Sequence, residues 1–194
     1  MSVKDFVQQR RDDFIAMRRD FHMYPEPAWL EYRSAAKVAE KLIALGYDVA
    51  LGAEVLDLDS RMGLPSEDVM KAAMARAMDE GADPELVEKM GYGKTAIVAT
   101  MKFSDDGPVV AFRADMDSND VIESKASNHI PAKNGFRSRH EKAMHACGHD
   151  THMTMGLGLA EYIATHKDGL KGTIKLIFQP AEEGVRGAKA MVEA

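Results

Sequence analysis

The sequence holds a single cysteine, Cys147, among its 194 residues. An intrachain disulfide is therefore excluded, and this thiol must be buried filler, a reactive group or a metal ligand. Long apolar runs are also missing, because none approaches the roughly 18 residues that a membrane span needs. The charged start MSVKDFVQQRRDD lacks the apolar core of a signal peptide. We therefore expect a cytoplasmic protein that makes no contact with a membrane.

An excess of positive charge is absent as well. The chain has 31 acidic and 25 basic side chains, a net charge of -6 and 7% aromatic residues. Without a basic stripe or interleaved aromatic side chains, nucleic acid is not an expected partner. Hydrophobic residues make up 45% of the sequence, which suffices for the buried core of one domain or of a large piece of a bigger one.

Hydrophobic spacing predicts several helices. Ser2 is a candidate N-cap for a helix that runs to about Phe21, and a second helix is expected over Tyr32 to Leu45. Gly46 stands where a left-handed C-terminal cap belongs. A third helix, rich in small residues, is expected to begin in the segment HACGHDTH and to continue to about His166.

The segment from about 56 to 93 differs in composition, being rich in Met, Ala and charged residues. Ser66 is a candidate N-cap there, and Met70, Met74 and Met78 recur at helical spacing. We interpret this segment as a helical insertion. The methionine stripe is expected to pack flexibly against the body of the protein rather than to bind a cofactor.

After Gly93 the hydrophobic period becomes that of strands. TAIVATM (95–101) and VVAFRAD (109–115) are expected to form a β-hairpin or adjacent strands, and TIKLIFQ (173–179) a buried strand. The order of strands and helices predicts a layered α/β/α domain with a central, mostly parallel sheet. Functional groups should then gather at the C-terminal ends of the strands.

The segment HACGHDTH combines thiol, imidazole and carboxylate groups. Cys147 and His149 flank Gly148, so a turn there could bring both onto one ion. A Cys-x-His pair alone is more often structural, because free cysteine behaves as a small buried hydrophobe. Its surroundings favour the metal interpretation, since further potential ligands adjoin the pair: His145, Asp150 and His152.

Two pairs of acids follow strands. Glu182 and Glu183 suit a division of labour in which one carboxylate binds a metal and the other takes a proton from water. The alternative is an acidic helix N-terminus favoured by the helix dipole. Asp115 and Asp117 can both reach a site from a strand end, or can simply face solvent. Arg113 is expected to pair with one of these aspartates.

The other histidines are expected to be ordinary surface groups, because they stand among charges or at predicted helix ends and loops. They are His22, His129, His140 and His166.

Three ordered motifs, RADMD (113–117), HACGHDTH (145–152) and QPAEEGVRGAKAMV (179–192), resemble the aminoacylase/carboxypeptidase metallopeptidases, and most closely their amidohydrolase branch. The resemblance implies that Cys147, His149 and Glu183 bind a two-metal site of zinc or manganese. It implies that Glu182 is the general base. It also implies that Asp117 orients one of the metal ligands without binding the metal itself.

The side chains expected to support these ligands are Asp115, His145, Asp150 and His152. Asp115 stands where related branches carry a metal-binding histidine, which leaves its role open. Asp117 is followed by Ser118 and Asn119, where relatives commonly have Ala-Leu.

The implied reaction is hydrolysis of the amide of an N-acyl amino acid, with p-aminobenzoyl-glutamate, a compound of folate catabolism, as the preferred substrate. The resemblance also implies a lid domain that forms a homodimer, further histidine ligands beyond Ala194, and a second subunit. The 194 residues would then be the N-terminal portion of a catalytic domain and inactive alone. Two alternatives stay open: a cysteine-nucleophile hydrolase using Cys147 with His149 or His145 as base, and a non-catalytic metal-binding or assembly module.

Overall fold

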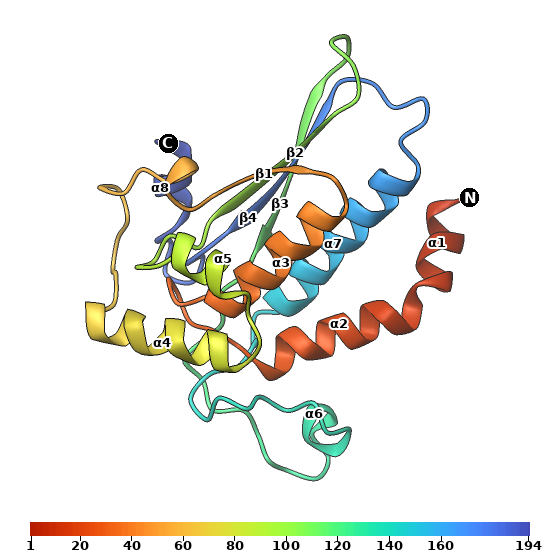
Figure 1. The fold of residues 1–194 in the computed structure, drawn as a ribbon. Coiled ribbons are helices and arrows are strands. Elements are labelled where there is room, and N and C mark those ends of the chain that lie inside the picture. The colour runs from red at the N-terminus through yellow and green to blue at the C-terminus, as the bar shows by residue number, and fades with distance from the viewer.

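The computed structural model describes residues 1–194. The chain forms a four-stranded sheet and a set of helices (Figure 1). The strands are β1 (Asp48–Leu51), β2 (Ile97–Lys102), β3 (Val109–Asp115) and β4 (Thr173–Gln179). The helices are α1 (Val3–Gln9), α2 (Arg11–Met23), α3 (Tyr32–Ala44), the 3-10 turn η1 (Gly52–Glu54), α4 (Glu67–Asp79), α5 (Pro84–Lys89), α6 (Ile130–Lys133), α7 (His149–Thr165) and α8 (Ala188–Val192).

The N-terminal helices begin and end close to the predicted residues. Ser2 caps α1, since its hydroxyl oxygen accepts the Asp5 N–H at 3.2 Å. The single predicted helix is divided at Arg10, where α1 ends and α2 begins. α3 ends at Ala44, and Gly46 follows with φ of 81°, the left-handed conformation that the sequence predicted.

The methionine stripe packs into the core, as predicted. Met70 and Met74 of α4 are both 6% exposed; Met74 belongs to the main hydrophobic cluster, and Met78 packs against it. That cluster also holds Leu42 of α3 and Phe178 of β4, so the segment between η1 and β2 is packed onto the body of the protein.

The sheet corrects two predictions about strand pairing. Its order is β1-β2-β4-β3, so β4 separates the two strands that were expected to be neighbours. Only β3 and β4 are parallel, whereas β2 is antiparallel to both β1 and β4, which makes this sheet mixed rather than mostly parallel. The turn between β2 and β3 lies against the start of β4, where Gly172 is so close that an added Cβ would lie 2.1 Å from the Pro108 carbonyl oxygen. The predicted α/β class is confirmed.

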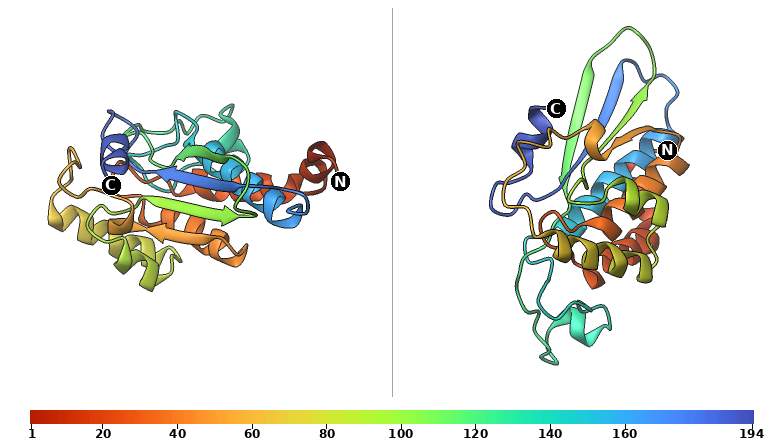
Figure 2. Two further views of the ribbon diagram at one scale, coloured as in Figure 1. Left: turned by 90° about the horizontal axis from the view of Figure 1, so that it is seen from above. Right: turned by 60° about the vertical axis from the view of Figure 1, so that its left-hand side comes forward.

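Two helices cover the sheet together. α3 and α7 pack against each other and against the strands, and α2 lies along α7 (Figures 1 and 2). The close approach of α7 depends on Gly156, because a Cβ there would lie 2.9 Å from the Phe178 ring. β3 is an edge strand, and its Val109 and Phe112 side chains are exposed.

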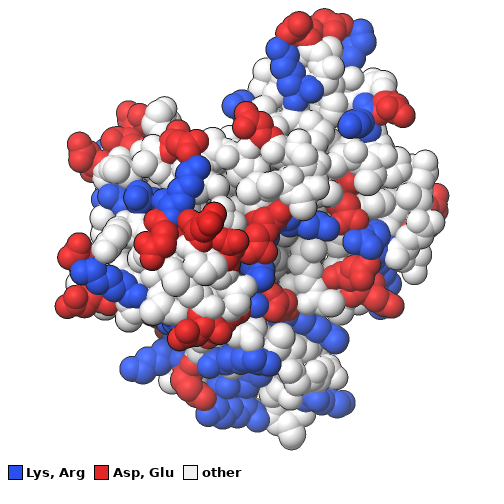
Figure 3. Space-filling model, viewed as in Figure 1, with Lys and Arg blue, Asp and Glu red and all other residues white.

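Charged side chains of both signs are interspersed over the face in Figure 3, and basic ones gather at its lower end, where the segment carrying α6 lies in Figure 1. None of the helices combines the length and the apolar character needed to cross a membrane.

Candidate metal centre

Three segments meet at one end of the sheet. Asp115 ends β3 opposite Gln179, which ends β4, because the two strands are parallel and in register there. His149 is the first residue of α7, after Gly148 in the left-handed conformation with φ of 88°. The sequence-predicted groups of all three motifs therefore converge at the C-terminal ends of β3 and β4 and the N-terminus of α7.

The imidazole of His149 is oriented by the main chain. Its Nδ1 lies 2.7 Å from the Asp117 carbonyl oxygen, which can only accept a hydrogen bond, so Nδ1 carries the proton. His149 is 2% exposed, and its Nε2 faces the carboxylates of the site. A histidine held in this way presents Nε2 as a ligand atom of fixed direction.

Four carboxylates surround this one ring. Their oxygens lie between 3.4 and 3.8 Å from the ring nitrogens of His149, and they belong to Asp115, Asp117, Glu182 and Glu183. Burial alone would lower the pKa of His149, but Asp117 and the charge of Asp115 outweigh it and raise the pKa to about 9. So many anions around one imidazole create a strong local attraction for a cation.

The predicted ligands Cys147, His149 and Glu183 are brought together. Each offers one ligand atom, and these three atoms all lie within 4.8 Å of one another. Cys147 is exposed, which excludes the buried-filler interpretation, and its N–H donates to Asn119 Oδ1 at 3.1 Å. Glu183 Oε1 is buried without any hydrogen-bond partner. A thiol, an imidazole and an unpartnered carboxylate oxygen at this spacing fit a divalent metal such as zinc.

A second group of potential ligands shares His149. It comprises Asp115, His149 and His152, again with ligand atoms within 4.8 Å. His152 Nδ1 lies 2.6 Å from Asp115 Oδ1, and Asp115 also pairs with Arg113 at 3.1 Å, as the sequence predicted. Two groups that overlap at one histidine suit two neighbouring ions. Asp115 and His152, expected only to support the ligands, therefore lie where they could bind directly.

Interaction with the Glu183 carboxylate raises the pKa of the Cys147 thiol. Without an ion, this cysteine is therefore held in its protonated, weakly nucleophilic form.

Two other predicted supporting residues lie deeper. Asp150 is fully buried and faces α2, where its carboxylate contacts His22 Nδ1 at 2.7 Å and Arg18 Nε at 2.9 Å. His145 is 4% exposed, and neither of its ring nitrogens has a hydrogen-bond partner. Burial lowers its pKa to about 4, so His145 is neutral near pH 7.

The prediction that His22 is a surface group is wrong. It is 3% exposed, and its two nitrogens bridge Asp150 and Glu123, the latter at 2.9 Å. Its charged neighbours in the sequence gave no sign of this, because the carboxylates that receive it come from distant segments. Glu123, itself buried, also accepts the Ser138 N–H and contacts His129 Nε2 at 2.8 Å.

The remaining histidines predicted to be on the surface, His129, His140 and His166, do not stand free in solvent. His140 lies between the Pro25 carbonyl and Glu80, and His166 stacks on Tyr162 with ring centroids 4.4 Å apart. All three therefore have defined partners in the fold.

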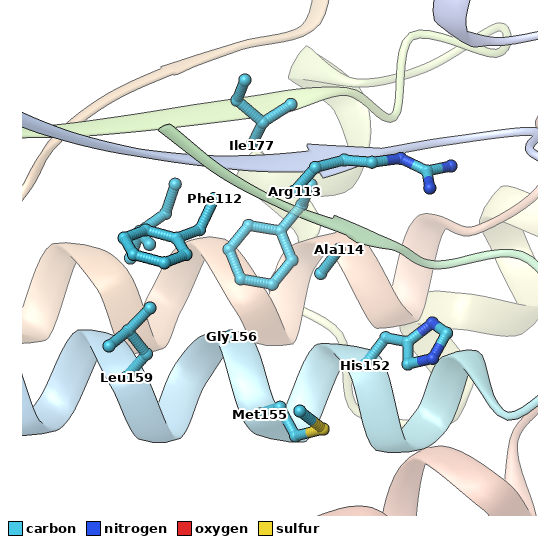
Figure 4. A pocket seen from close by; sticks show the side chains of 10 residues that line it. Phe112, Arg113, Ala114, His152, Met155, Gly156, Leu159 and Ile177 are labelled. Carbon is cyan, nitrogen blue, oxygen red and sulfur yellow. The ribbon is translucent and has the colours of Figure 1, made fainter. Parts of the chain in front are cut away.

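An apolar hollow of about 320 Å³ adjoins the cluster along the edge strand (Figure 4). Its wall is formed by Phe112, Met155, Leu159 and Ile177 from β3, β4 and α7, with His152 and Arg113 at one end.

Part of the chain matches a known protein family. Residues 111–194 match the family described as Peptidase family M20/M25/M40. The matched residues include all three motifs that form the cluster. Over residues 111–194 the chain is therefore similar to this peptidase family.

Similarity to individual proteins extends over the whole chain. It is 48% identical over 193 residues to a subunit of the p-aminobenzoyl-glutamate hydrolase of Escherichia coli, covering 100% of this chain and 44% of that protein. It is 47% identical over 192 residues to indole-3-acetyl-aspartic acid hydrolase of Enterobacter agglomerans, covering 99% of this chain and 44% of that protein. The chain thus spans less than half the length of these relatives.

A solved structure supports the fold. The Bacillus subtilis YXEP protein, described as a dinuclear metal-binding peptidase of the M20 family, matches with a TM-score of 0.64 and 28% identity. The match covers 98% of this chain and 40% of that one.

Proposed function

We propose that this chain supplies metal ligands and the general base of a metal-dependent hydrolase that cleaves the amide of an N-acyl amino acid. The observation that carries the proposal is the ring of four carboxylates around His149, together with the Cys147 thiol. Adjacent anions are mutually repulsive, and a cluster of this kind is stable when a cation occupies it.

Cys147, His149 and Glu183 would hold one ion, and Asp115 and His152 are candidates for contacts to a second beside it. When bound, divalent ions lower the pKa of water toward roughly 7 and polarise a carbonyl group. The set of one sulfur, one nitrogen and one oxygen ligand favours zinc, and manganese is the alternative.

Glu182 is the proposed general base. Its Oε2 lies 3.8 Å from His149 Nε2, beside the proposed ligands, and its side chain is 37% exposed, so water and substrate can reach it. It would accept the proton of the attacking water and pass that proton to the departing amine. Arg113 NH2 lies 3.9 Å from Glu182 Oε1, so this arginine borders the proposed base.

The proposed substrates join an aromatic acyl group to an acidic amino acid. This class is supported by the two relatives, one named for p-aminobenzoyl-glutamate and the other for indole-3-acetyl-aspartic acid. p-Aminobenzoyl-glutamate is the substrate we favour. Because the first of these relatives is named as one subunit of its hydrolase, we also propose that a second subunit takes part.

We further propose that residues 1–194 form the N-terminal portion of the catalytic domain. The segment 56–93, which contains α4 and α5, would be a helical insertion in it. This proposal agrees with the 44% of each relative that the chain covers.

The test uses the longest natural chain that contains these residues. Metal content is measured by elemental analysis, and release of the amino acid is followed with p-aminobenzoyl-glutamate, indole-3-acetyl-aspartate and N-acetyl-alanine. We expect bound zinc or manganese, loss of turnover on chelation, recovery on adding the metal back, and preference for the two aromatic substrates. A metal-free protein that turns over these substrates would contradict the proposal.

The same assay separates the cysteine-nucleophile alternative. That mechanism predicts activity that survives chelation and is abolished by alkylation of Cys147. The raised pKa of this thiol argues against it, because the thiolate is the nucleophilic form. Bound metal without turnover of any substrate would instead favour a non-catalytic metal-binding or assembly module.

A further inference from the structure

Three consecutive main-chain N–H groups of the PAEEG segment donate hydrogen bonds to two buried carboxylates. The Ala181 N–H donates to Glu31 Oε1 at 2.8 Å. The N–H groups of Glu182 and Glu183 donate to the two oxygens of Asp117, each at 3.0 Å. Glu31 and Asp117 both have 0% exposure, so the turn is held from inside the protein.

Glu31 lies in the loop before α3 and was not among the residues that the sequence singled out. Its Oε1 also accepts the Trp29 N–H at 2.9 Å, and its Oε2 accepts the Thr95 hydroxyl at 2.7 Å. All of its hydrogen-bond partners are neutral groups. A buried carboxylate is usually paired with a cation, so this arrangement is unfavourable for folding alone.

The two amides that share Glu31 Oε1 belong to residues with unusual backbone. Trp29 has φ of 66° and Ala181 has φ of 49°, in the left-handed region that is strained for non-glycine residues. At Ala181 this conformation turns the chain immediately before Glu182. The hydrogen bond from the Ala181 N–H to Glu31 Oε1 favours the strained turn over its relaxed alternatives.

We propose that Glu31 is a positioning residue that, with Asp117, fixes the 181–183 turn and so aims Glu182 and Glu183 at His149. This inference rests on the proposed function for its kinetic consequence. Glu31 contacts none of the proposed ligands, and it acts through the Ala181 amide. Its role is to hold a shape, and the negative charge itself is secondary.

Two substitutions separate shape from charge. In Glu31→Gln, the amide oxygen still accepts from Trp29 and Ala181, and its NH2 can donate to the Thr95 hydroxyl, which rotates to accept. In Glu31→Asp, the carboxyl group remains, but the side chain is one methylene too short to keep all three partners. We expect Glu31→Gln to keep kcat within about 3-fold, and Glu31→Asp to lower kcat about 100-fold with little change in KM.

The matched control is Glu26, another fully buried carboxylate. Its oxygens accept the N–H groups of Arg33 at 2.9 Å and Ser34 at 2.8 Å, at the start of α3 and not in the site. Glu26→Asp should lower the melting temperature and leave the kcat of the folded protein unchanged. Equal kcat losses in Glu26→Asp and Glu31→Asp would assign both to general instability and overturn the proposal.

A second readout needs no activity. Amide hydrogen exchange at residues 181–183 should be about 10-fold or more faster in Glu31→Asp than in the wild type, and nearly unchanged in Glu31→Gln and Glu26→Asp. If Glu31→Asp does not fold, Thr95→Val, which removes one donor to Glu31, takes its place with a smaller increase in exchange. If amide exchange at residues 181–183 is the same in all variants, the proposed positioning role of Glu31 is refuted. Absence of hydrolysis by the wild type would refute only the proposed function.

Discussion

His149 and Asp117 meet twice: Nδ1 of the ring lies 2.7 Å from the Asp117 carbonyl oxygen and 3.4 Å from its carboxylate Oδ1. The first contact sets the direction of the ring, and the second favours its protonated form. In the metal-free protein, Asp117→Asn should therefore lower the pKa of His149 from about 9, because a negative charge beside the imidazolium is removed. The measurement is an NMR titration of the ring protons. Asp120→Asn, at an exposed position in the same loop, should leave that titration unchanged.

Replacing the proposed base separates the roles of the two adjacent glutamates. Glu182→Gln in the longest natural chain should reduce hydrolysis by about 100- to 10,000-fold while metal content stays nearly intact, since the amide keeps the shape but cannot accept the proton. Metal content and turnover are measured on the same preparation. If Glu182→Gln loses its metal and Glu183→Gln keeps it, the two assignments are exchanged.

Cys147 gives a direct report on metal binding, because no other thiol exists in the chain. Alkylation should be slow when metal is bound and should accelerate after chelation, and Cys147→Ser should weaken binding of at least one ion. Mass spectrometry of the labelled protein gives both rates. Identical rates with and without metal would place the thiol outside the metal site.

The buried bridge at His22 predicts a large effect on stability. Burial alone would lower the pKa of His22, but its hydrogen bonds to Asp150 and Glu123 raise it, so the folded protein favours the imidazolium. His22→Ala leaves two buried carboxylates without this partner and should cost about 3 to 5 kcal/mol in urea unfolding. Because the folded pKa is raised, the difference from wild type should be largest below the unfolded pKa of about 6.5 and should shrink as pH rises. His166→Ala, at a half-buried position, is the control.

Glu31 should make the unfolding free energy depend on pH in the opposite direction from a carboxylate stabilised by a salt bridge. Burial and the nearby charge of Asp117 raise its pKa from 4.5 to about 8, so between these values the folded chain binds a proton that the unfolded chain has released. Its contribution to stability is present below pH 4.5 and is lost as pH rises toward 8. The unfolding free energy of the metal-free wild type should therefore fall with pH more steeply than that of Glu31→Gln. Parallel curves would mean that Glu31 is ionised in both states throughout.

Local signals in the sequence carried much of the fold. Ser2, Gly46 and the methionine stripe of α4 were predictable because caps, left-handed glycines and helical periodicity depend on neighbouring residues. Strand order was not. Alternation in β2 and β3 indicates strands but contains nothing about β4, which arrives more than fifty residues later and lies between them.

The candidate site divides in the same way. The three motifs pointed to Cys147, His149 and Glu183, whose ligand atoms indeed lie together. Glu31 and His22 escaped detection because a single acid or histidine outside any motif resembles a solvated surface residue. Their partners are 150 and 128 residues away in the chain, so only the folded structure reveals them.

The distances along the chain between these partners also bear on how the site forms during folding. His149 contacts Asp117 across 32 residues, Asp117 contacts Glu183 across 66, and Glu31 contacts Ala181 across 150. Loops of such length close late, because chain entropy opposes long-range contacts until other packing compensates. An unfolded or half-folded chain can offer an ion little more than the segment HACGHDTH, whose potential ligands are neighbours in sequence. Tight metal binding should therefore appear only at the last stage of folding. A spectroscopic signal from the bound metal, abolished by a chelator, would then follow the formation of the long-range contacts rather than the formation of helices.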